Sequence, residues 1–366
     1  MTDLLKFRKG FPVLSQYTYL NTAAWGPMHE DLHAWRGEQE LDFLVGGSDF
    51  KIDSLSLLDQ VRERIGVCFG CSQDRIALVP NFSLGLNMLL DGLPKQSRVV
   101  LLEGDYPSLN WPFEDRPFQC RHLPADTRVE ERILESLRAE PAEVLAISLV
   151  QWINGLLISP EFLATLKEEF PGLLIVADAT QYLGAFDLDF DASVIDVLGA
   201  SGYKWMLGGN GNGFLLLSEE ATTRFHVRTI GFQSVFHDPR RRESVSLAQR
   251  LEPGHLDTLS FGSLWFGLGL LQEVGLDRVE AYNRELWGKV LNALDSRGLL
   301  APGIAGRPVH SGIFSIPNRE GWFDALGEQG VVCSQRGGGI RLSFHCYNTD
   351  ADLQTVLEVL DQKGNR

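Results

Sequence analysis

The middle of the chain contains a series of short apolar runs, and these constrain the fold more than any other feature of the sequence. Strands that are buried on both faces have this composition, because neither face needs polar side chains. Helical patterns at 130–138 and 161–170 lie between some of the runs. Strands that alternate with helices predict an α/β fold with a mostly parallel sheet. The runs are residues 99–102, 144–150, 173–177, 194–200 and 213–217.

The pattern changes after about residue 218, which indicates a second, smaller domain. The arginine-rich segment 236–250 has no strand pattern and is predicted to be a loop or linker. A long helical pattern follows at 259–294, and the chain ends with a strand pattern at 339–343 and a helical pattern at 350–361. We therefore predict a large domain of residues 16–245 and a smaller α+β domain formed by residues 1–15 and 246–366.

Composition and charge exclude several classes of partner. The formal net charge is −15, and a field of this sign repels nucleic acid and anionic membranes. No stretch approaches the roughly 18 apolar residues of a membrane span, and the N-terminus lacks the apolar core of a signal peptide. Five cysteines are scattered, and the pair Cys68 and Cys71 lacks the second pair that a zinc site needs. We expect a cytoplasmic protein without a metal site.

Two of the apolar runs lead into polar residues that can carry chemistry. Ligands of an open α/β sheet bind at the carboxyl ends of its strands. Asp178 directly follows the run 173–177, although an acid there can also cap a helix. Lys204 follows another run among apolar and aromatic neighbours, where its pKa should fall; a lysine that extends from a loop into solvent is the alternative. The glycine-rich stretch 208–213 lacks the ending of a P-loop and is interpreted as a tight connection.

These residues belong to a longer series of motifs. The series comprises Tyr19–Pro27, Asn81–Asn87, Gly104–Ser108, Asp178 with Gln181, Ser201–Lys204, and Gly339–Ser343 with Tyr347–Thr349. In this order it resembles the class V family of pyridoxal 5′-phosphate (PLP)-dependent aminotransferases, over almost the whole chain. That family includes cysteine desulfurases, kynureninases and isopenicillin-N-epimerase-like proteins. The resemblance implies the aspartate aminotransferase-like fold, fold type I.

The resemblance also implies a role for each matching residue. Lys204 would hold PLP as a Schiff base and act as the catalytic residue. Asp178 would lie beside the pyridine nitrogen, because a protonated ring is the better electron sink. The phosphate would lie at the helix N-terminus that begins at Phe82, and Arg341 would bind the substrate carboxylate with two parallel hydrogen bonds. The other residues implied are Ser83, Tyr106, Gln181, Ser201, Tyr203 and, from a neighbouring subunit, His255 for the cofactor, and Asn21 and Trp152 for the substrate.

Taken singly, two of these assignments have ordinary structural alternatives. Tyr106 would then be equally well explained as a core side chain. Arg341 would be explained as a partner in a surface salt bridge. The order of the motifs, and not any one residue, therefore supports the assignment.

The chain departs from the desulfurases in ways that bear on the reaction. Tyr203 precedes the lysine where they have a histidine, and Tyr106 stands where they stack a histidine on the cofactor. The loop that carries their catalytic cysteine corresponds to the short stretch 332–339, in which Cys333 is predicted to be a strand residue made inert by burial. We expect a homodimeric aminotransferase acting on an amino acid. A PLP-dependent lyase or epimerase is an alternative. A non-catalytic scaffold is an alternative of another class, which the intact Lys204, Asp178 and Arg341 disfavour.

Overall fold

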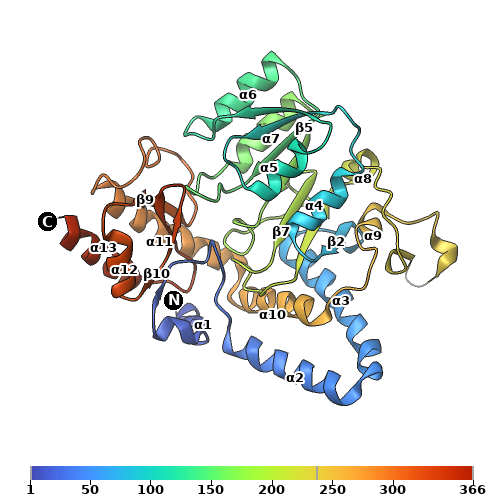
Figure 1. The fold of residues 1–366 in the computed structure, drawn as a ribbon, viewed down its shortest axis with the longest axis horizontal. Helices are drawn as coiled ribbons and strands as arrows, with labels where there is room; N and C mark the ends of the chain where they lie inside the picture. Colours follow the sequence, from blue (N-terminus) through green and yellow to red (C-terminus); the bar gives the residue numbers. More distant parts are fainter. Residues whose placement is uncertain (1, 236–237, 365–366) are drawn as a thin grey trace.

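A seven-stranded sheet lies at the centre of the computed structural model, which describes residues 2–235 and 238–364 (Figure 1). The strand order is β2-β8-β7-β6-β5-β3-β4. Strand β8 runs antiparallel to both of its neighbours and the other pairs are parallel, so the predicted mostly parallel sheet is confirmed. The strands are β2 (Ile76–Val79), β3 (Arg98–Leu102), β4 (Gln119–Leu123), β5 (Val144–Ser148), β6 (Leu174–Asp178), β7 (Val197–Ser201) and β8 (Gly213–Leu217).

Successive residues of the central strands enter two different hydrophobic cores, which explains why these strands are apolar throughout. In β5, Leu145 and Ile147 belong to one core, and Val144 and Ala146 belong to the other, because side chains alternate across a strand. The first core also takes residues from α3 (Ser48–Phe69), α6 (Val129–Ala139), α7 (Pro160–Glu169) and α10 (Thr258–Val274). The second takes residues from α4 (Phe82–Leu90), α5 (Pro107–Glu114), α8 (Glu219–Arg224) and α9 (Leu247–Arg250).

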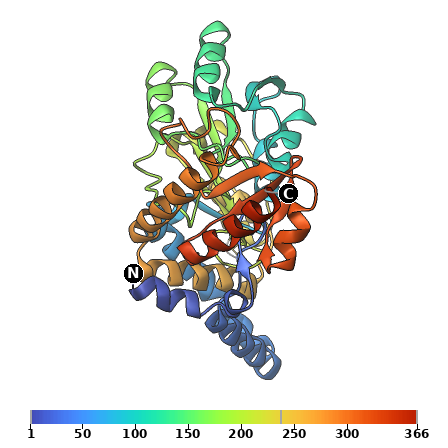
Figure 2. The same cartoon turned by 90° about the vertical axis from the view of Figure 1, so that its left-hand side faces the viewer.

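The C-terminal elements, orange to red in Figures 1 and 2, form a smaller unit beside the large sheet. Three of its strands form an antiparallel sheet in the order β11-β12-β9. The short strand β1 (Thr18–Tyr19), from the start of the chain, pairs in parallel with β10. The elements of this unit are α11 (Leu276–Asp295), β9 (Ile313–Pro317), α12 (Trp322–Glu328), β10 (Val331–Val332), β11 (Ser334–Arg336), β12 (Gly339–Ser343) and α13 (Asp350–Gly364).

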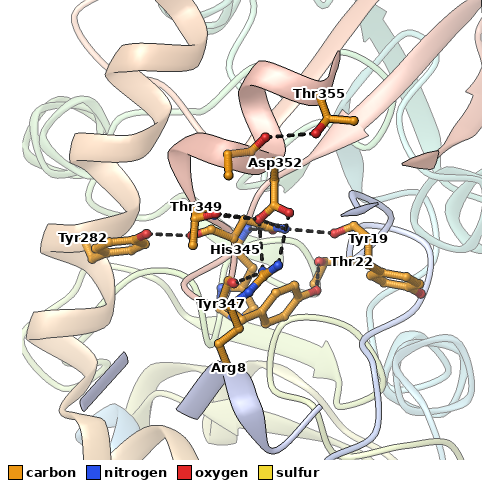
Figure 3. Close-up of polar contacts among 11 residues, drawn as sticks. Arg8, Tyr19, Thr22, Tyr282, His345, Tyr347, Thr349, Asp352 and Thr355 are labelled. Carbon is orange, nitrogen blue, oxygen red and sulfur yellow. Dashed lines mark hydrogen bonds and ion pairs between the residues drawn. The ribbon is translucent and has the colours of Figure 1, made fainter. Parts of the chain in front are cut away.

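A network of polar contacts fixes the N-terminal segment to these C-terminal elements (Figure 3). Arg8 of α1 (Thr2–Lys9) forms an ion pair with Asp352 of α13 at 3.0 Å. The amide of Asn348 donates to the carbonyl of Tyr19 at 3.0 Å, and the hydroxyl groups of Thr22 and Tyr347 share a hydrogen bond. The segment that follows Thr22 therefore starts from a fixed position relative to β12.

The helical regions differ from the sequence predictions in two places. The pattern at 259–294 forms two helices, because Gly275, with a φ of 94°, leaves the helical conformation between α10 and α11. The segment 236–250, predicted to be a loop, contains η4 (Pro239–Arg241) and α9, while Phe236 and His237 lie outside the described residues.

The first part of the chain adds the helix α2 (Glu30–Gly46), which with α3 forms a projecting arm (Figure 1). Helix α10 packs against both α2 and α3. Among the residues described, no helix combines the length and the apolar character needed to cross a membrane.

Candidate active site

The predicted lysine and aspartate lie together at the carboxyl ends of two neighbouring strands. Asp178 is the last residue of β6, and β7 ends at Ser201, three residues before Lys204. The two strands pair with Asp178 opposite Gly199. The side chains of Asp178 and Lys204 are both buried, although charged residues of either kind seldom are unless they are paired. This is the position at which an open α/β sheet binds its ligand.

Burial changes the protonation of both groups. It lowers the pKa of Lys204 to about 8, against the smaller, opposite effect of the Asp178 carboxylate. It also raises the pKa of Asp178 to about 6, although hydrogen bonding to Thr180 and the charge of Lys204 act in the other direction. Asp178 is therefore mostly ionised at neutral pH, and Lys204 forms the neutral, nucleophilic amine far more readily than an exposed lysine does.

Aromatic side chains surround the Lys204 amine. The Nζ atom lies 5.4 Å from the ring centroid of Tyr106 and 5.4 Å from that of Tyr203, and burial together with the nearby Tyr106 phenol raises the pKa of Tyr203. The ring of Trp152 meets that of Tyr106 edge to face at 5.7 Å. Tyr106, Tyr203 and Trp152, three of the predicted residues, thus form one wall of the site.

Asp105, which was not among the predicted site residues, holds this wall in place. Its carboxylate is buried and accepts hydrogen bonds from the backbone N–H groups of Tyr106, at 2.7 Å, and Ser148, at 2.8 Å. Ser148 ends β5 and pairs with Asp178. Asp105 therefore links the loop that carries Tyr106 to the strand beside Asp178.

The N-terminus of α4 faces the end of β7. Asn81 caps this helix, with its side-chain oxygen accepting from Leu84 N at 2.9 Å. The N–H of Phe82 donates to the Ser201 hydroxyl at 3.0 Å. Ser83 is the next residue in the first turn of the helix. The structure thus brings Phe82, Ser83 and Ser201 together, at a helix end suited to binding an anion.

Gln181 is buried between two other parts of the chain. Its amide nitrogen donates to the carbonyl of Ala23 at 2.9 Å, and its oxygen accepts from the indole of Trp205 at 2.7 Å. An amide nitrogen has two N–H groups, so the second one is the donor that Gln181 can offer to a ligand.

Strand β12 places Arg341 in the same region. Its side chain is only 2% exposed, and its Nη1 donates to the carbonyl of Trp152 at 2.6 Å. Its Nε is buried without a hydrogen-bond partner. Burial is also the main reason that the pKa of Arg341 falls to about 10. A buried donor without a partner is costly, and a carboxylate bound by Arg341 would supply the acceptor.

The remaining predicted residues lie further out. The Asn21 side chain accepts a hydrogen bond from Ser334, next to the Arg341 strand. His255 is exposed on the loop between α9 and α10, which the buried Glu252 anchors by accepting from Leu78 N at 2.7 Å. The role of His255 at a site of a neighbouring subunit stays a prediction.

The cysteines do not have the environment of a nucleophile. Cys333 is half-buried between β10 and β11, and burial raises its pKa to about 11. Burial likewise raises the pKa values of Cys68, to about 11, and Cys71, to about 12. Reactive cysteines have lowered pKa values. The described residues also contain no cluster of His, Cys, Asp and Glu side chains that could hold a metal ion.

The fold and this arrangement define a PLP-dependent enzyme of fold type I, and comparison with known proteins agrees. The family described as Aminotransferase class-V matches residues 45–356, so the chain belongs to this family. The chain is 20% identical to an uncharacterized aminotransferase, YcbU, of Bacillus subtilis (strain 168), over 98% of this chain and 97% of YcbU. It is 23% identical to isopenicillin N epimerase of Streptomyces clavuligerus, over 93% of this chain and 94% of the epimerase.

Solved structures confirm the fold. A lysine-to-alanine mutant of C-DES with glycine covalently linked to the PLP cofactor superposes with a TM-score of 0.85 at 17% identity, covering 96% of this chain and 98% of that one. The apo structure of a cysteine desulfurase from Thermococcus onnurineus NA1 gives a TM-score of 0.82 at 20% identity, covering 98% of each chain. The cofactor of the family is PLP, and the residues described above fit it: a buried amine of lowered pKa, a buried carboxylate and a helix N-terminus.

The lowered pKa of Lys204 predicts a specific pH dependence. In cofactor-free protein, acetylation of Lys204 should rise with pH and reach half its maximal rate near pH 8, because only the neutral amine reacts. Asp178→Asn should move this midpoint to lower pH, since the carboxylate favours the charged ammonium. Mass spectrometry of the Lys204 peptide measures the rate, with exposed Lys95 as the reference for reagent activity. A midpoint at the ordinary lysine value of about 10.4, or a shift to higher pH in Asp178→Asn, would contradict this assignment.

Proposed function

We propose that this enzyme is an aminotransferase that acts on an α-amino acid, with Lys204 carrying PLP. Two features carry this proposal. Lys204 is a buried amine of lowered pKa, and Arg341 is buried with an Nε that has no hydrogen-bond partner. The half-buried Cys333, with its raised pKa, disfavours attack by a thiol. This argues against the activity named for relatives such as the probable cysteine desulfurase of Pyrococcus abyssi, 24% identical over 79% of each chain.

Different residues of the chain would bind the cofactor and transfer the proton. When bound, PLP supplies an electron sink for a bond broken at the α-carbon of an amino acid. Asp178, ionised at neutral pH, would keep the ring nitrogen beside it protonated. Lys204, once released from the cofactor, would accept the α-proton, because its pKa near 8 suits a general base near neutral pH.

Binding of the cofactor and substrate is proposed for the other residues at the site. Tyr106 would stack on the cofactor ring and Gln181 would bond its 3′ oxygen. Arg341 would hold the substrate α-carboxylate. Phe82, Ser83, Ser201 and Tyr203 would surround the phosphate, with His255 from a neighbouring subunit, and Asn21 and Trp152 would line the substrate side.

We also propose a homodimer. The exposed loop that carries His255 would complete the site of the partner subunit. Several large apolar side chains of α2, Leu41, Phe43, Leu44 and Val45, are exposed in the isolated chain, as expected of a surface that another subunit covers. Sedimentation that finds a monomer with normal PLP binding would exclude the shared site.

A single-turnover experiment separates transamination from its alternatives. Holoenzyme mixed with an amino acid alone should release up to one keto acid per active site and then stop, because the amino group has no acceptor. Addition of a keto acid should restore turnover. Continuous product without a keto acid would identify a lyase. Formation of the other enantiomer, with exchange of the α-proton for solvent deuterium, would identify an epimerase, the activity named for the relative from Streptomyces clavuligerus.

Replacement of Arg341 tests whether the substrate is an amino acid. Arg341→Lys keeps the charge but loses the planar fork. It should bind PLP normally and lose kcat/KM for amino acids on the order of a hundredfold. The loss should be smaller for amines that lack an α-carboxylate. Equal losses for amino acids and simple amines would show that Arg341 is structural.

A further inference from the structure

A second arginine lies on the same face of the small sheet as Arg341. Strands β11 and β12 pair with Ser334 opposite Arg341 and Arg336 opposite Gly339. Side chains of directly opposed residues point to the same face of an antiparallel pair, and residues two apart along a strand share that face. Arg336 and Arg341 therefore extend from one face.

The Arg336 guanidinium is exposed and close to the cationic groups of the site. Its charge lowers the pKa values of both Arg341 and Lys204. Its Nη1 donates to the neighbouring carbonyl of Gln335 at 2.8 Å. Arg336 forms no ion pair with any acid in the part of the chain that the structure describes, whereas most arginines there have one.

The acids at the site do not balance this charge. Asp105 is buried and accepts from the backbone N–H groups of Tyr106 and Ser148. Asp178 accepts from the N–H of Thr180 and favours the charged form of Lys204, but no acid is among the groups that shift the pKa of Arg341. Two guanidinium groups and Lys204 thus share one region of a protein whose net charge is −15. Like charges held together repel each other, and a bound anion relieves that repulsion.

We infer that Arg336 binds a second acidic group of the substrate, so that the enzyme acts on α-amino acids with a carboxylate at the end of the side chain. This inference rests on the proposed function. The two arginines differ in burial, as we expect if one binds the α-carboxylate and the other binds a carboxylate further from the reacting carbon. Arg341 is buried next to Trp152 with its Nε unoccupied, and suits the group nearest the reacting carbon. Arg336 is exposed and suits a group further out.

The turn between the strands fixes where Arg336 begins. Gly337 and Gly338 have φ values of 56° and 79°, which favour glycine. A Cβ atom at Gly337 would lie 2.4 Å from Ile153 Cγ2. The hairpin therefore packs closely against the residue that follows Trp152, and the long Arg336 side chain extends from a backbone held at the edge of the site.

Unreactive acids test the inference through binding alone. Calorimetry with holoenzyme should show that succinate, glutarate or adipate binds more tightly than the monocarboxylate of equal carbon number, by on the order of ten- to a hundredfold for the best length. Arg336→Gln should abolish this preference and leave monocarboxylate binding within about twofold. Arg319→Gln removes one exposed positive charge elsewhere on the small unit, where Arg319 stacks over Trp322 at 4.7 Å, and should keep the preference.

The outcomes separate the inference from the function on which it rests. A wild-type enzyme without preference for dicarboxylates would overturn the inference, as would an Arg336→Gln variant that weakens both classes of acid equally or loses PLP. In each case a holoenzyme that still converts amino acids would leave the proposed function intact. Failure of the holoenzyme to act on any amino acid would contradict the proposed function itself.

Discussion

Burial of the Lys204 amine beside the Asp178 carboxylate is the constraint on which the rest of the site depends. An amine with a pKa near 8 requires that water be excluded from it, and exclusion requires that several parts of the chain cover one turn. The N-terminal segment does so at close range. Gly26 N donates to Tyr203 O at 2.8 Å, and a Cβ atom at Gly26 would lie 2.1 Å from Lys204 O. Only glycine fits this contact.

The C-terminal unit covers the same turn from another direction. His345 is fully buried and its Nε2 bonds the carbonyl of Trp205, one residue after the lysine, at 3.0 Å. The indole N–H of Trp205 also donates a hydrogen bond to the Gln181 side chain. The contacts of Arg8 and Thr22 in Figure 3, together with the hydrogen bond from Asn348 to the Tyr19 carbonyl, attach the N-terminal segment to this unit. Lys204 and Arg341, which are far apart in sequence, therefore depend on the same set of contacts for their relative positions.

The sequence predicts the large sheet better than the arrangement around it. Apolar runs such as 144–150 and 173–177 form β5 and β6 because both faces of these strands are covered. No local sequence pattern indicates that β8 runs antiparallel, because a buried apolar strand has the same composition in either direction. The break at Gly275 was missed because the residues on both sides of it continue a helical pattern.

The same limit applies to the site. Motifs predict site roles for Lys204, Asp178 and Arg341, because each stands at the end of a strand or within a characteristic run. The contacts of Asp105 and Arg336 exist only in the folded chain: the Asp105 carboxylate joins the loop of Tyr106 to strand β5, and Arg336 shares a sheet face with Arg341. Strand register and burial decide the contacts of both residues, and they depend on pairs of residues that are distant in the chain.

Reduction of the purified holoprotein with borohydride, followed by mass mapping of its peptides, tests whether Lys204 carries the cofactor. Reduction makes the linkage between cofactor and lysine permanent, so the modified residue can be identified. The mass of reduced PLP should appear on the peptide that contains Lys204, and Lys204→Ala should remove it while the protein stays folded. A modification on another lysine, or a folded protein that binds PLP without any covalent linkage, would show that Lys204 does not carry the cofactor.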